Sequence, residues 1–379
     1  MKLSERLNTI EESATLALNT KAKELAAEGK KIYNFTAGEP SANTPEYIKE
    51  YLAGKLDQNH YTPVPGIPEL REAIAEHAKE FYSSEWIKNE NVMVVAGGKP
   101  GLYLSLLALI NPGDEVILPT PAWVSYKYIV ELAGGTVAEA RLTDNFDLDI
   151  ANIEAAITDK TKVVIINSPN NPTGSIYSPD SLKKLSELLA NTSVTVLADD
   201  MYTKLVYDTS FEPITKYGFK NLIISSGFSK SQVLTGWRVG YVIAKPEIIK
   251  ALTKMQSHLL GNTSNLSQYA AMAGLARGDK PAAYEALKAN LEIVNRILKT
   301  VPKIKYTPPA GAFYAFIDIR GISGSSMGWC QELLDKKGVA LVPGEAFFAP
   351  GYVRLSFTTD GSTLEEGLEK IKEFIEESS

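Results

Sequence analysis

A lysine and an arginine stand eight residues apart in a stretch rich in small residues, 226–240 (SGFSKSQVLTGWRVG). The amine of Lys230 can form a Schiff base with an aldehyde, because a primary amine condenses reversibly with a carbonyl. The guanidinium of Arg238 can pair two phosphate oxygens at once with its planar fork of donors. We therefore expect a ligand that carries both an aldehyde and a phosphate, and pyridoxal 5'-phosphate (PLP) carries both.

A pair of acidic residues follows a short run of β-branched and apolar residues, 194–198. PLP needs a carboxylate against its ring nitrogen, because this group keeps the pyridine protonated and makes the ring an electron sink. The run predicts a strand, and a carboxylate just past its end, Asp199 or Asp200, can point into such a site. Periodicity does not decide between the two. Tyr202 follows closely and can hydrogen-bond the phenolic oxygen of the ring.

Three further motifs lie in turns that follow predicted strands. Asn171 stands in a turn rich in Asn and Pro, and its amide can donate to the O3' oxygen of PLP. Gly98 and Lys99 stand in a Gly-Gly-Lys turn that opens a helix, where backbone N–H groups can approach a phosphate and the helix dipole favours it. Trp123 can stack on the pyridine ring.

The elements that must position these residues are visible between about residue 45 and residue 280. Short β-branched runs alternate there with stretches of helical periodicity, which is typical of βαβ units and a mostly parallel sheet sandwiched by helices. Ligands of such sheets bind at the carboxyl ends of the strands, where the motifs fall. We expect strands at 92–96, 115–118, 137–140, 163–166, 194–198, 222–225 and 239–243, and helices at 68–82, 101–110, 125–132 and 179–189.

A different pattern follows residue 280. A long helical stretch is succeeded by two strands and two more helices, which indicates a smaller α+β lobe. The expected elements are helices at 282–300, 326–337 and 364–377 and strands at 313–317 and 353–357. We therefore predict an α/β fold with a large PLP-binding domain, residues 45–285, and a small α+β domain made of residues 1–44 and 286–379.

Composition excludes several classes of protein. The chain of 379 residues has 39 Lys+Arg and 45 Asp+Glu, a net charge of −6, and is not built to coat nucleic acid or an anionic membrane. A single cysteine, Cys330, and three scattered histidines argue against a metal site. The N-terminus has no apolar signal-peptide core and the apolar runs are too short to span a bilayer, so we expect a cytoplasmic enzyme.

Together the motifs resemble the class I aminotransferases, which are PLP enzymes of fold type I, and in particular the prokaryotic type of aspartate aminotransferase. The resemblance covers essentially the whole chain. It implies that Lys230 is the Schiff-base lysine and that Asp199, three residues before Tyr202, is the partner of the pyridinium. The other implied cofactor contacts are Gly98, Lys99, Ser229 and Arg238 at the phosphate, Asn171 and Tyr202 at O3', and Trp123 against the ring.

The resemblance also implies how substrate and a second subunit are bound. Arg354 matches the arginine that binds the substrate α-carboxylate, and Gly38 matches a residue beside it. Lys99 and Thr15 match polar contacts to a second, distal carboxylate. Tyr61 resembles a tyrosine that reaches the cofactor phosphate of the neighbouring subunit, which implies a homodimer with shared active sites. The implied substrate contacts are Gly38, Trp123, Asn171, Arg354, Lys99 and Thr15.

Two features depart from the family pattern. No arginine matches the one that animal-type aspartate enzymes use across the subunit interface for the distal carboxylate. Gly227 stands where many members have a phosphate-binding serine, so Ser226 or Ser229 is expected to replace that contact. The implied reaction is ping-pong transamination, in which Lys230 moves a proton between the substrate Cα and the cofactor. Aspartate and 2-oxoglutarate are the expected pair. The alternatives are an aromatic or prephenate aminotransferase, a PLP-dependent carbon–sulfur β-lyase, and a regulatory module that keeps the fold without turnover.

Overall fold

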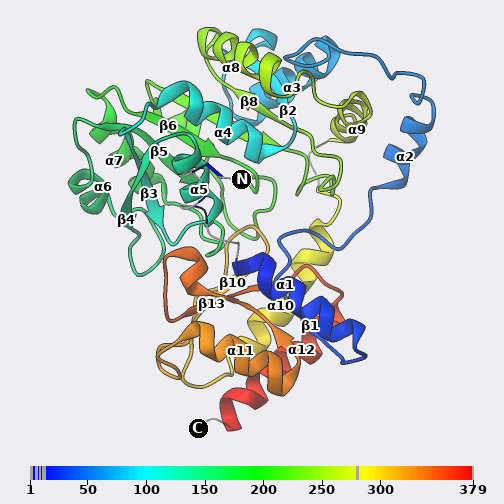
Figure 1. The fold of residues 1–379 in the computed structure, drawn as a ribbon, viewed down its shortest axis with the longest axis vertical. Helices are drawn as coiled ribbons and strands as arrows, with labels where there is room; N and C mark the ends of the chain where they lie inside the picture. The colour runs from blue at the N-terminus through cyan, green and yellow to red at the C-terminus, as the bar shows by residue number, and fades with distance from the viewer. Residues whose placement is uncertain (1–2, 5–6, 8–9, 11–13, 279–280, 378–379) are drawn as a thin grey trace.

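A seven-stranded sheet forms the centre of the larger lobe (Figure 1). In the computed structural model, residues 3, 4, 7, 10, 14–278 and 281–377 are described, the side chains of 14–18 excepted. Every neighbouring pair of strands is parallel except the two pairs made by β8, so the predicted mostly parallel sheet is confirmed. The order across the sheet is β2 (Val92–Val95), β8 (Gly240–Ile243), β7 (Leu222–Gly227), β6 (Thr195–Asp199), β5 (Thr161–Asn167), β3 (Glu115–Thr120) and β4 (Thr136–Arg141).

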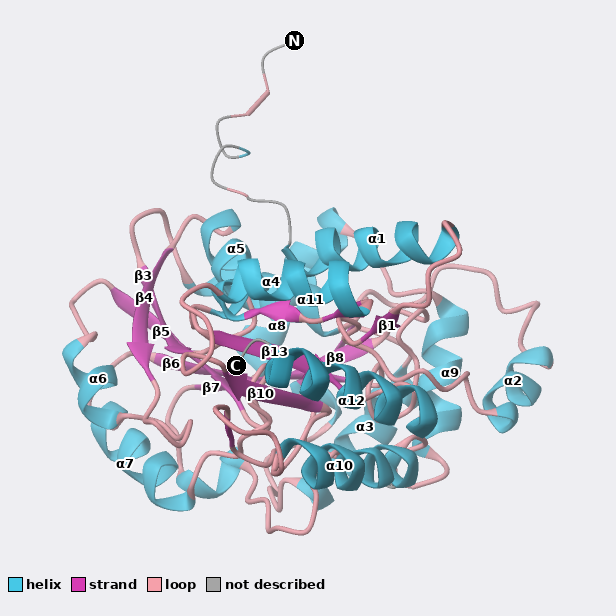
Figure 2. Ribbon diagram, turned by 90° about the horizontal axis from the view of Figure 1, so that it is seen from below, coloured by secondary structure: helices cyan, strands magenta, loops and turns pink. Residues whose placement is uncertain are grey.

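Helices cover both faces of this sheet (Figure 2). Alternate residues of a strand point to opposite faces, and in β2 Val92 and Val94 pack into one apolar core while Met93 and Val95 pack into another. The first core is completed by α3 (Pro68–Phe81), α6 (Ile150–Ala155), α7 (Pro179–Leu189) and α9 (Asn265–Leu275). The second is completed by α4 (Gly98–Leu109), α5 (Ser125–Leu132) and α8 (Pro246–Leu259).

The smaller lobe is built on a four-stranded antiparallel sheet in the order β12 (Val342–Pro343), β13 (Tyr352–Ser356), β10 (Tyr314–Asp318) and β9 (Lys305–Tyr306). A short parallel pair joins β1 (Tyr33–Asn34) to β11 (Val339–Ala340), so an N-terminal segment packs beside C-terminal ones. The helices of this lobe are α1 (Ala14–Ala27), α10 (Tyr284–Leu298), α11 (Ser326–Lys337) and α12 (Gly361–Glu377). Figure 1 shows them gathered around β10 and β13.

The remaining elements are short. They are α2 (Glu46–Ala53) and the 3₁₀ turns η2 (Asn89–Asn91), η3 (Ile214–Tyr217) and η4 (Gly344–Phe347). None of these was expected from the sequence. Among the helices of the described residues, none combines the length and apolar character needed to cross a bilayer.

Helix starts differ from expectation where a cap or glycine turn begins the helix. α4 begins at Gly98 rather than at residue 101, because the glycine turn itself forms the first turn. α12 begins at Gly361 rather than at residue 364, because the Asp360 carboxylate accepts hydrogen bonds from the Thr363 N–H and the Ser362 hydroxyl.

Where the two lobes meet, some residues of each lobe pack into the apolar core of the other. Phe316 and Phe347 pack into a core of the larger sheet. Tyr202 and Tyr207 pack into the core around β10 and β13. The domain boundaries expected at residues 44 and 285 stay a prediction, and the contact between lobes is where the candidate site lies.

Candidate active site

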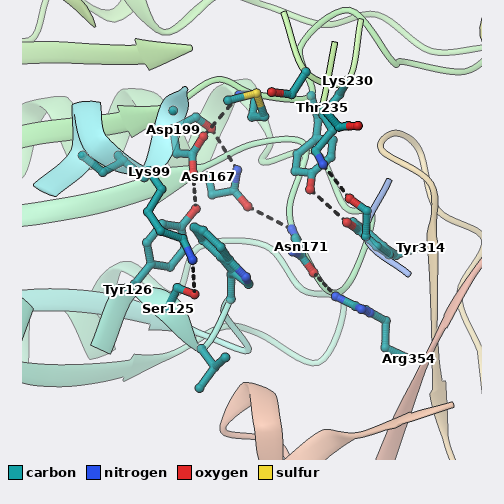
Figure 3. A pocket seen from close by; sticks show the side chains of 18 of the residues that line it. Lys99, Ser125, Tyr126, Asn167, Asn171, Asp199, Lys230, Thr235, Tyr314 and Arg354 are labelled. Atoms are coloured by element: carbon teal, nitrogen blue, oxygen red, sulfur yellow. Dashed lines mark hydrogen bonds between the residues drawn. The ribbon is translucent and has the colours of Figure 1, made fainter. Parts of the chain in front are cut away.

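A cavity of about 350 Å³ lies at the carboxyl ends of the larger sheet's strands, where residues of the smaller lobe close it (Figure 3). This is the place where open α/β sheets bind ligands. Most of the candidate residues come together here, although they are far apart in the sequence. Lining it are Gly38, Gly98, Lys99, Trp123, Asn171, Asp199, Tyr202, Ser229, Lys230, Arg238 and Arg354.

Lys230 lies just beyond β7 with its amine in the cavity. Its Nζ donates a hydrogen bond to the carbonyl oxygen of Gly38, 2.5 Å away. Burial lowers the pKa of Lys230 to about 8, although the nearby Glu39 carboxylate acts in the opposite direction. Burial therefore favours the neutral amine, which is the form that attacks a carbonyl or accepts a proton.

Asp199 ends β6, and its carboxylate faces the cavity. The Tyr126 hydroxyl donates to Asp199 Oδ2 at 2.7 Å, and the Met201 N–H donates to Oδ1 at 3.3 Å. Burial raises the pKa of Asp199 to about 6, against these hydrogen bonds. Asp200 lines a separate small hollow and accepts a hydrogen bond from the Tyr82 hydroxyl at 2.8 Å. Of the two aspartates, Asp199 is the one in the cavity.

A chain of hydrogen bonds connects Asp199 to Arg354 (Figure 3). Asn167 Nδ2 donates to the Asp199 carbonyl oxygen at 2.8 Å, and the Asn171 N–H donates to Asn167 Oδ1 at 2.9 Å. Arg354 Nη1 then donates to Asn171 Oδ1 at 3.0 Å, and its Nη2 donates to the Thr36 carbonyl at 2.9 Å. The buried Nε of Arg354 has no hydrogen-bond partner among the described residues.

The turn that opens α4 faces Arg238. Gly97 caps this helix with φ of 98°, a conformation that favours glycine. A Cβ atom on Gly97 would lie 2.6 Å from Arg238 Nη2, so only a residue without a side chain lets the guanidinium approach the helix N-terminus this closely. A helix N-terminus beside an arginine is suited to bind an anion.

Of the two serines expected to replace the phosphate contact at Gly227, one lies in the cavity. Ser229 lines the cavity. The Ser226 hydroxyl donates to the Asp200 carbonyl at 3.1 Å and is absent from the residues that line the cavity. A Cβ atom on Gly227 would lie only 3.0 Å from the Cα of Gly240 on β8, which explains why a glycine stands in place of the family's serine.

Lys99 lies at one side of the cavity, in contact with Trp123 just before α5 and with Ser125, the first residue of α5. Its Nζ donates to Ser125 Oγ at 3.2 Å and lies 4.7 Å from the centroid of the Trp123 ring. Burial, and then the positive charge of Arg238, lower the pKa of Lys99. A cation held by an aromatic face and one hydroxyl keeps donors for an anionic ligand.

One candidate residue lies away from the cavity, and the side chain of another is not described. Tyr61 is 97% exposed and lies at a surface hollow of about 620 Å³ shared with Leu56 and Leu266. Thr15 lies in α1, and its side chain is outside the described part of the chain.

Asn167, Tyr126 and Tyr314 are among the cavity residues to which no sequence motif had pointed. Asn167 could have been found, because it ends β5 in register with Asp199 on the neighbouring strand. Tyr126 stands three residues beyond Trp123, but only the packing of α5 shows that its hydroxyl reaches Asp199. Tyr314 comes from β10 of the other lobe, and no local pattern pointed to it.

The comparison with known proteins agrees with this geometry. Residues 30–371 match the model of the family described as aminotransferase class I and II. The chain belongs to this family. It is therefore a PLP-dependent aminotransferase, and the predicted cofactor and reaction type are confirmed.

Individual relatives cover almost all of the chain. An aspartate aminotransferase of Thermotoga maritima is 40% identical, and the match covers 98% of this chain and 99% of the relative. A crystal structure of the aspartate aminotransferase of Thermotoga maritima superimposes with a TM-score of 0.94 and 39% identity, over 99% of this chain and 100% of that one. The aspartate aminotransferase of Thermus thermophilus, solved with maleate, superimposes with a TM-score of 0.93 and 34% identity, over 98% and 99% of the two chains.

The residues present fit PLP. The glycine turn lets the Arg238 guanidinium lie against the N-terminus of α4, and a Cβ atom on Gly97 would displace it. The buried carboxyl of Asp199 can accept a hydrogen bond from a protonated ring nitrogen, which would replace part of its lost hydration. Lys230 supplies the amine.

Proposed function

We propose that this aminotransferase transfers the amino group of aspartate to 2-oxoglutarate. The single observation that carries the proposal is that one cavity joins Lys230 and Asp199 to two cationic side chains from different lobes, Lys99 and Arg354. Two cations suit a substrate with two carboxylates. The names of the relatives support the same substrate, and maleate, which is bound by the Thermus thermophilus enzyme, is itself a dicarboxylate.

The cofactor is held at its two ends by different elements. The backbone N–H groups of Gly98 and Lys99 at the start of α4, together with Ser229 and Arg238, bind the phosphate. Asp199 would face the ring nitrogen, Asn171 and Tyr202 would face the O3' oxygen, and Trp123 would stack on the ring. These assignments agree with the lining of the cavity.

When bound, PLP supplies an aldehyde that takes up the amino group and a ring that accepts electron density from the substrate Cα. Lys230 Nζ removes the proton from Cα and returns one to the C4' carbon, so a single amine acts as base and then as acid. Its lowered pKa suits both tasks near neutral pH. Asp199 keeps the ring nitrogen protonated, because its negative charge is buried beside it.

Each carboxylate of the substrate has a separate partner. Arg354 offers its unpartnered Nε and a remaining Nη proton to the α-carboxylate, which favours a two-pronged pairing. Lys99 pairs with the distal carboxylate. Asn171 accepts a hydrogen bond from Arg354 and thereby orients it. Gly38, Trp123 and Thr15 complete the proposed substrate contacts.

We also propose a cytoplasmic homodimer in which Tyr61 reaches the cofactor phosphate of the other subunit. Tyr61 is exposed and does not line the cavity of its own subunit, which is consistent with a contact to the cavity of the other subunit. Apolar side chains are exposed along the same surface, at Leu56, Leu259 and Leu260. A patch of this kind is typical of a protein–protein interface.

The test is a screen of the first half-reaction. Purified holoenzyme is mixed with each amino acid in turn, and the absorbance of the lysine-bound cofactor is followed. We expect aspartate and glutamate to convert the cofactor fastest, with oxaloacetate and 2-oxoglutarate as the products. Faster conversion by aromatic amino acids, or release of ammonia and pyruvate without an oxo-acid acceptor, would replace this proposal by an aromatic aminotransferase or a β-lyase.

A further inference from the structure

Tyr314 is a buried tyrosine on the wall of the cavity that the smaller lobe provides. Its hydroxyl oxygen lies 3.0 Å from that of Tyr202. The guanidinium carbon of Arg354 lies 4.5 Å from the centroid of its ring. One side chain therefore contacts a residue proposed to bind the cofactor and a residue proposed to bind the substrate.

We propose that Tyr314 is a positioning residue with two separable parts: its hydroxyl directs the proton of Tyr202 towards the cofactor, and its ring fixes the plane of Arg354. The inference rests on the proposed function, in which Tyr202 faces O3' and Arg354 faces the α-carboxylate. It assigns a role at the cofactor site of the larger lobe to a residue of the smaller lobe.

The hydroxyl argument follows from counting protons. Either tyrosine can donate in the pair, and each hydroxyl carries one proton. Once Tyr202 donates its proton to the O3' oxygen, the proton between the two hydroxyls must come from Tyr314. A hydroxyl that accepts a hydrogen bond is polarised and becomes a stronger donor. Tyr314 therefore strengthens the bond that Tyr202 makes to the cofactor.

The ring argument concerns the orientation of Arg354. Its guanidinium carbon lies 4.5 Å from the Tyr314 ring centroid and 4.8 Å from that of Phe347, so two aromatic side chains contact it. A guanidinium stacks on aromatic faces, and a carboxylate is paired in the guanidinium plane. Losing the Tyr314 ring would free that plane to tilt.

The first experiment isolates the hydroxyl with Tyr314→Phe, which keeps the ring. The absorbance of the holoenzyme is titrated with pH, because protonation of the lysine–cofactor linkage changes its colour. A hydrogen bond to the ionised O3' oxygen favours the unprotonated linkage, so weakening that bond raises the titration midpoint. Polarisation contributes roughly 10–30% of such a bond, which predicts an upward shift of about 0.1–0.7 pH unit, smaller than that of Tyr202→Phe.

The second experiment removes the ring with Tyr314→Leu and measures kcat and KM separately. We expect KM for aspartate to rise about 3- to 30-fold, the range of a desolvated cation–π contact. Tyr314→Phe should change KM less than about twofold, because it retains that contact. A residue that acted only through stability would not separate the two readouts in this way.

Tyr207→Phe is the matched control. It also removes a buried hydroxyl from the same core, one that donates to the Ala312 carbonyl at 2.7 Å, but it does not line the cavity. Its titration midpoint should equal that of the wild-type protein. The proposal is overturned if the midpoint of Tyr314→Phe also equals that of the wild type, or if Tyr207→Phe raises the midpoint by the same amount as Tyr314→Phe. The titration requires only bound PLP, so it decides this proposal even if the wild-type protein binds PLP and fails to transaminate aspartate.

Discussion

Lys99 is the residue on which the proposed preference for a dicarboxylate depends. A charge-assisted hydrogen bond is worth about 1.5–3 kcal/mol, so Lys99→Ala should lower kcat/KM for aspartate by roughly one to two powers of ten. The effect on alanine should be much smaller, because alanine lacks the distal group. Steady-state kinetics with both substrates give the ratio that matters.

A matched control for this change is Lys127→Ala, which removes a lysine of α5 that does not line the cavity. Its aspartate to alanine ratio should equal that of the wild-type enzyme. An equal loss on both substrates in Lys99→Ala would mean that the lysine serves the cofactor phosphate instead of the substrate.

The buried, ionised Asp199 carboxylate should lower the free energy of unfolding of the protein without cofactor. Its pKa in the folded protein, about 6, lies above the 3.8 of an unperturbed aspartate, so the folded state binds more protons between these pH values and loses stability as pH rises through them. Asp199→Asn should therefore stabilise the apoprotein at pH 7.5, by up to about 3 kcal/mol. Thermal unfolding should show a gain that shrinks towards pH 5.

The exposed Asp159 provides the control, since Asp159→Asn should leave the unfolding temperature unchanged at both pH values. Asp199→Asn should also cripple transamination while the phosphate contacts retain the cofactor. If Asp199→Asn is both active and no more stable than the wild type, Asp199 is not the partner of the ring nitrogen.

At the scale of elements, the close approach of β7 and β8 determines the shape of the lysine loop. A Cβ on Gly227 would lie 3.0 Å from the Cα of Gly240 and 3.2 Å from the Val239 carbonyl oxygen. Backbone atoms cannot move aside cheaply, so Gly227→Ala should destabilise the protein by about 1–3 kcal/mol and weaken PLP binding. Gly324→Ala, where no atom lies within 4 Å, should do neither. Equal unfolding temperatures would contradict the crowding argument.

At the scale of the whole molecule, shared sites predict complementation between inactive variants. A mixed dimer of Tyr61→Ala and Lys230→Ala subunits contains one site with both residues intact. With random pairing half of the dimers are mixed, so about a quarter of the wild-type activity should return on mixing. Each variant incubated alone provides the baseline. An active monomer in sedimentation experiments would refute the arrangement.

Much of the site was predictable from short stretches of sequence because the chemistry is local there. The stretch 226–240 around Lys230 and Arg238 suits a ligand with an aldehyde and a phosphate, and the turns at Gly98 and Asn171 follow β-branched runs that are strands in the structure. Alternating strands and helices predicted a parallel sheet, and its carboxyl edge is where the cavity lies. The sequence by itself therefore determined the cofactor, the class of fold and the face of the sheet that binds.

Only the tertiary structure decided between neighbours in the chain and between partners far apart in it. Asp199 and Asp200 are identical in chemistry, and the position of β6 between its neighbours turns one towards the cavity and the other towards Tyr82. The same is true of Ser226 and Ser229. Tyr314 reaches Tyr202 across 112 positions of sequence, because the two lobes pack at this point. Such contacts depend on packing between elements, which local residue patterns do not encode.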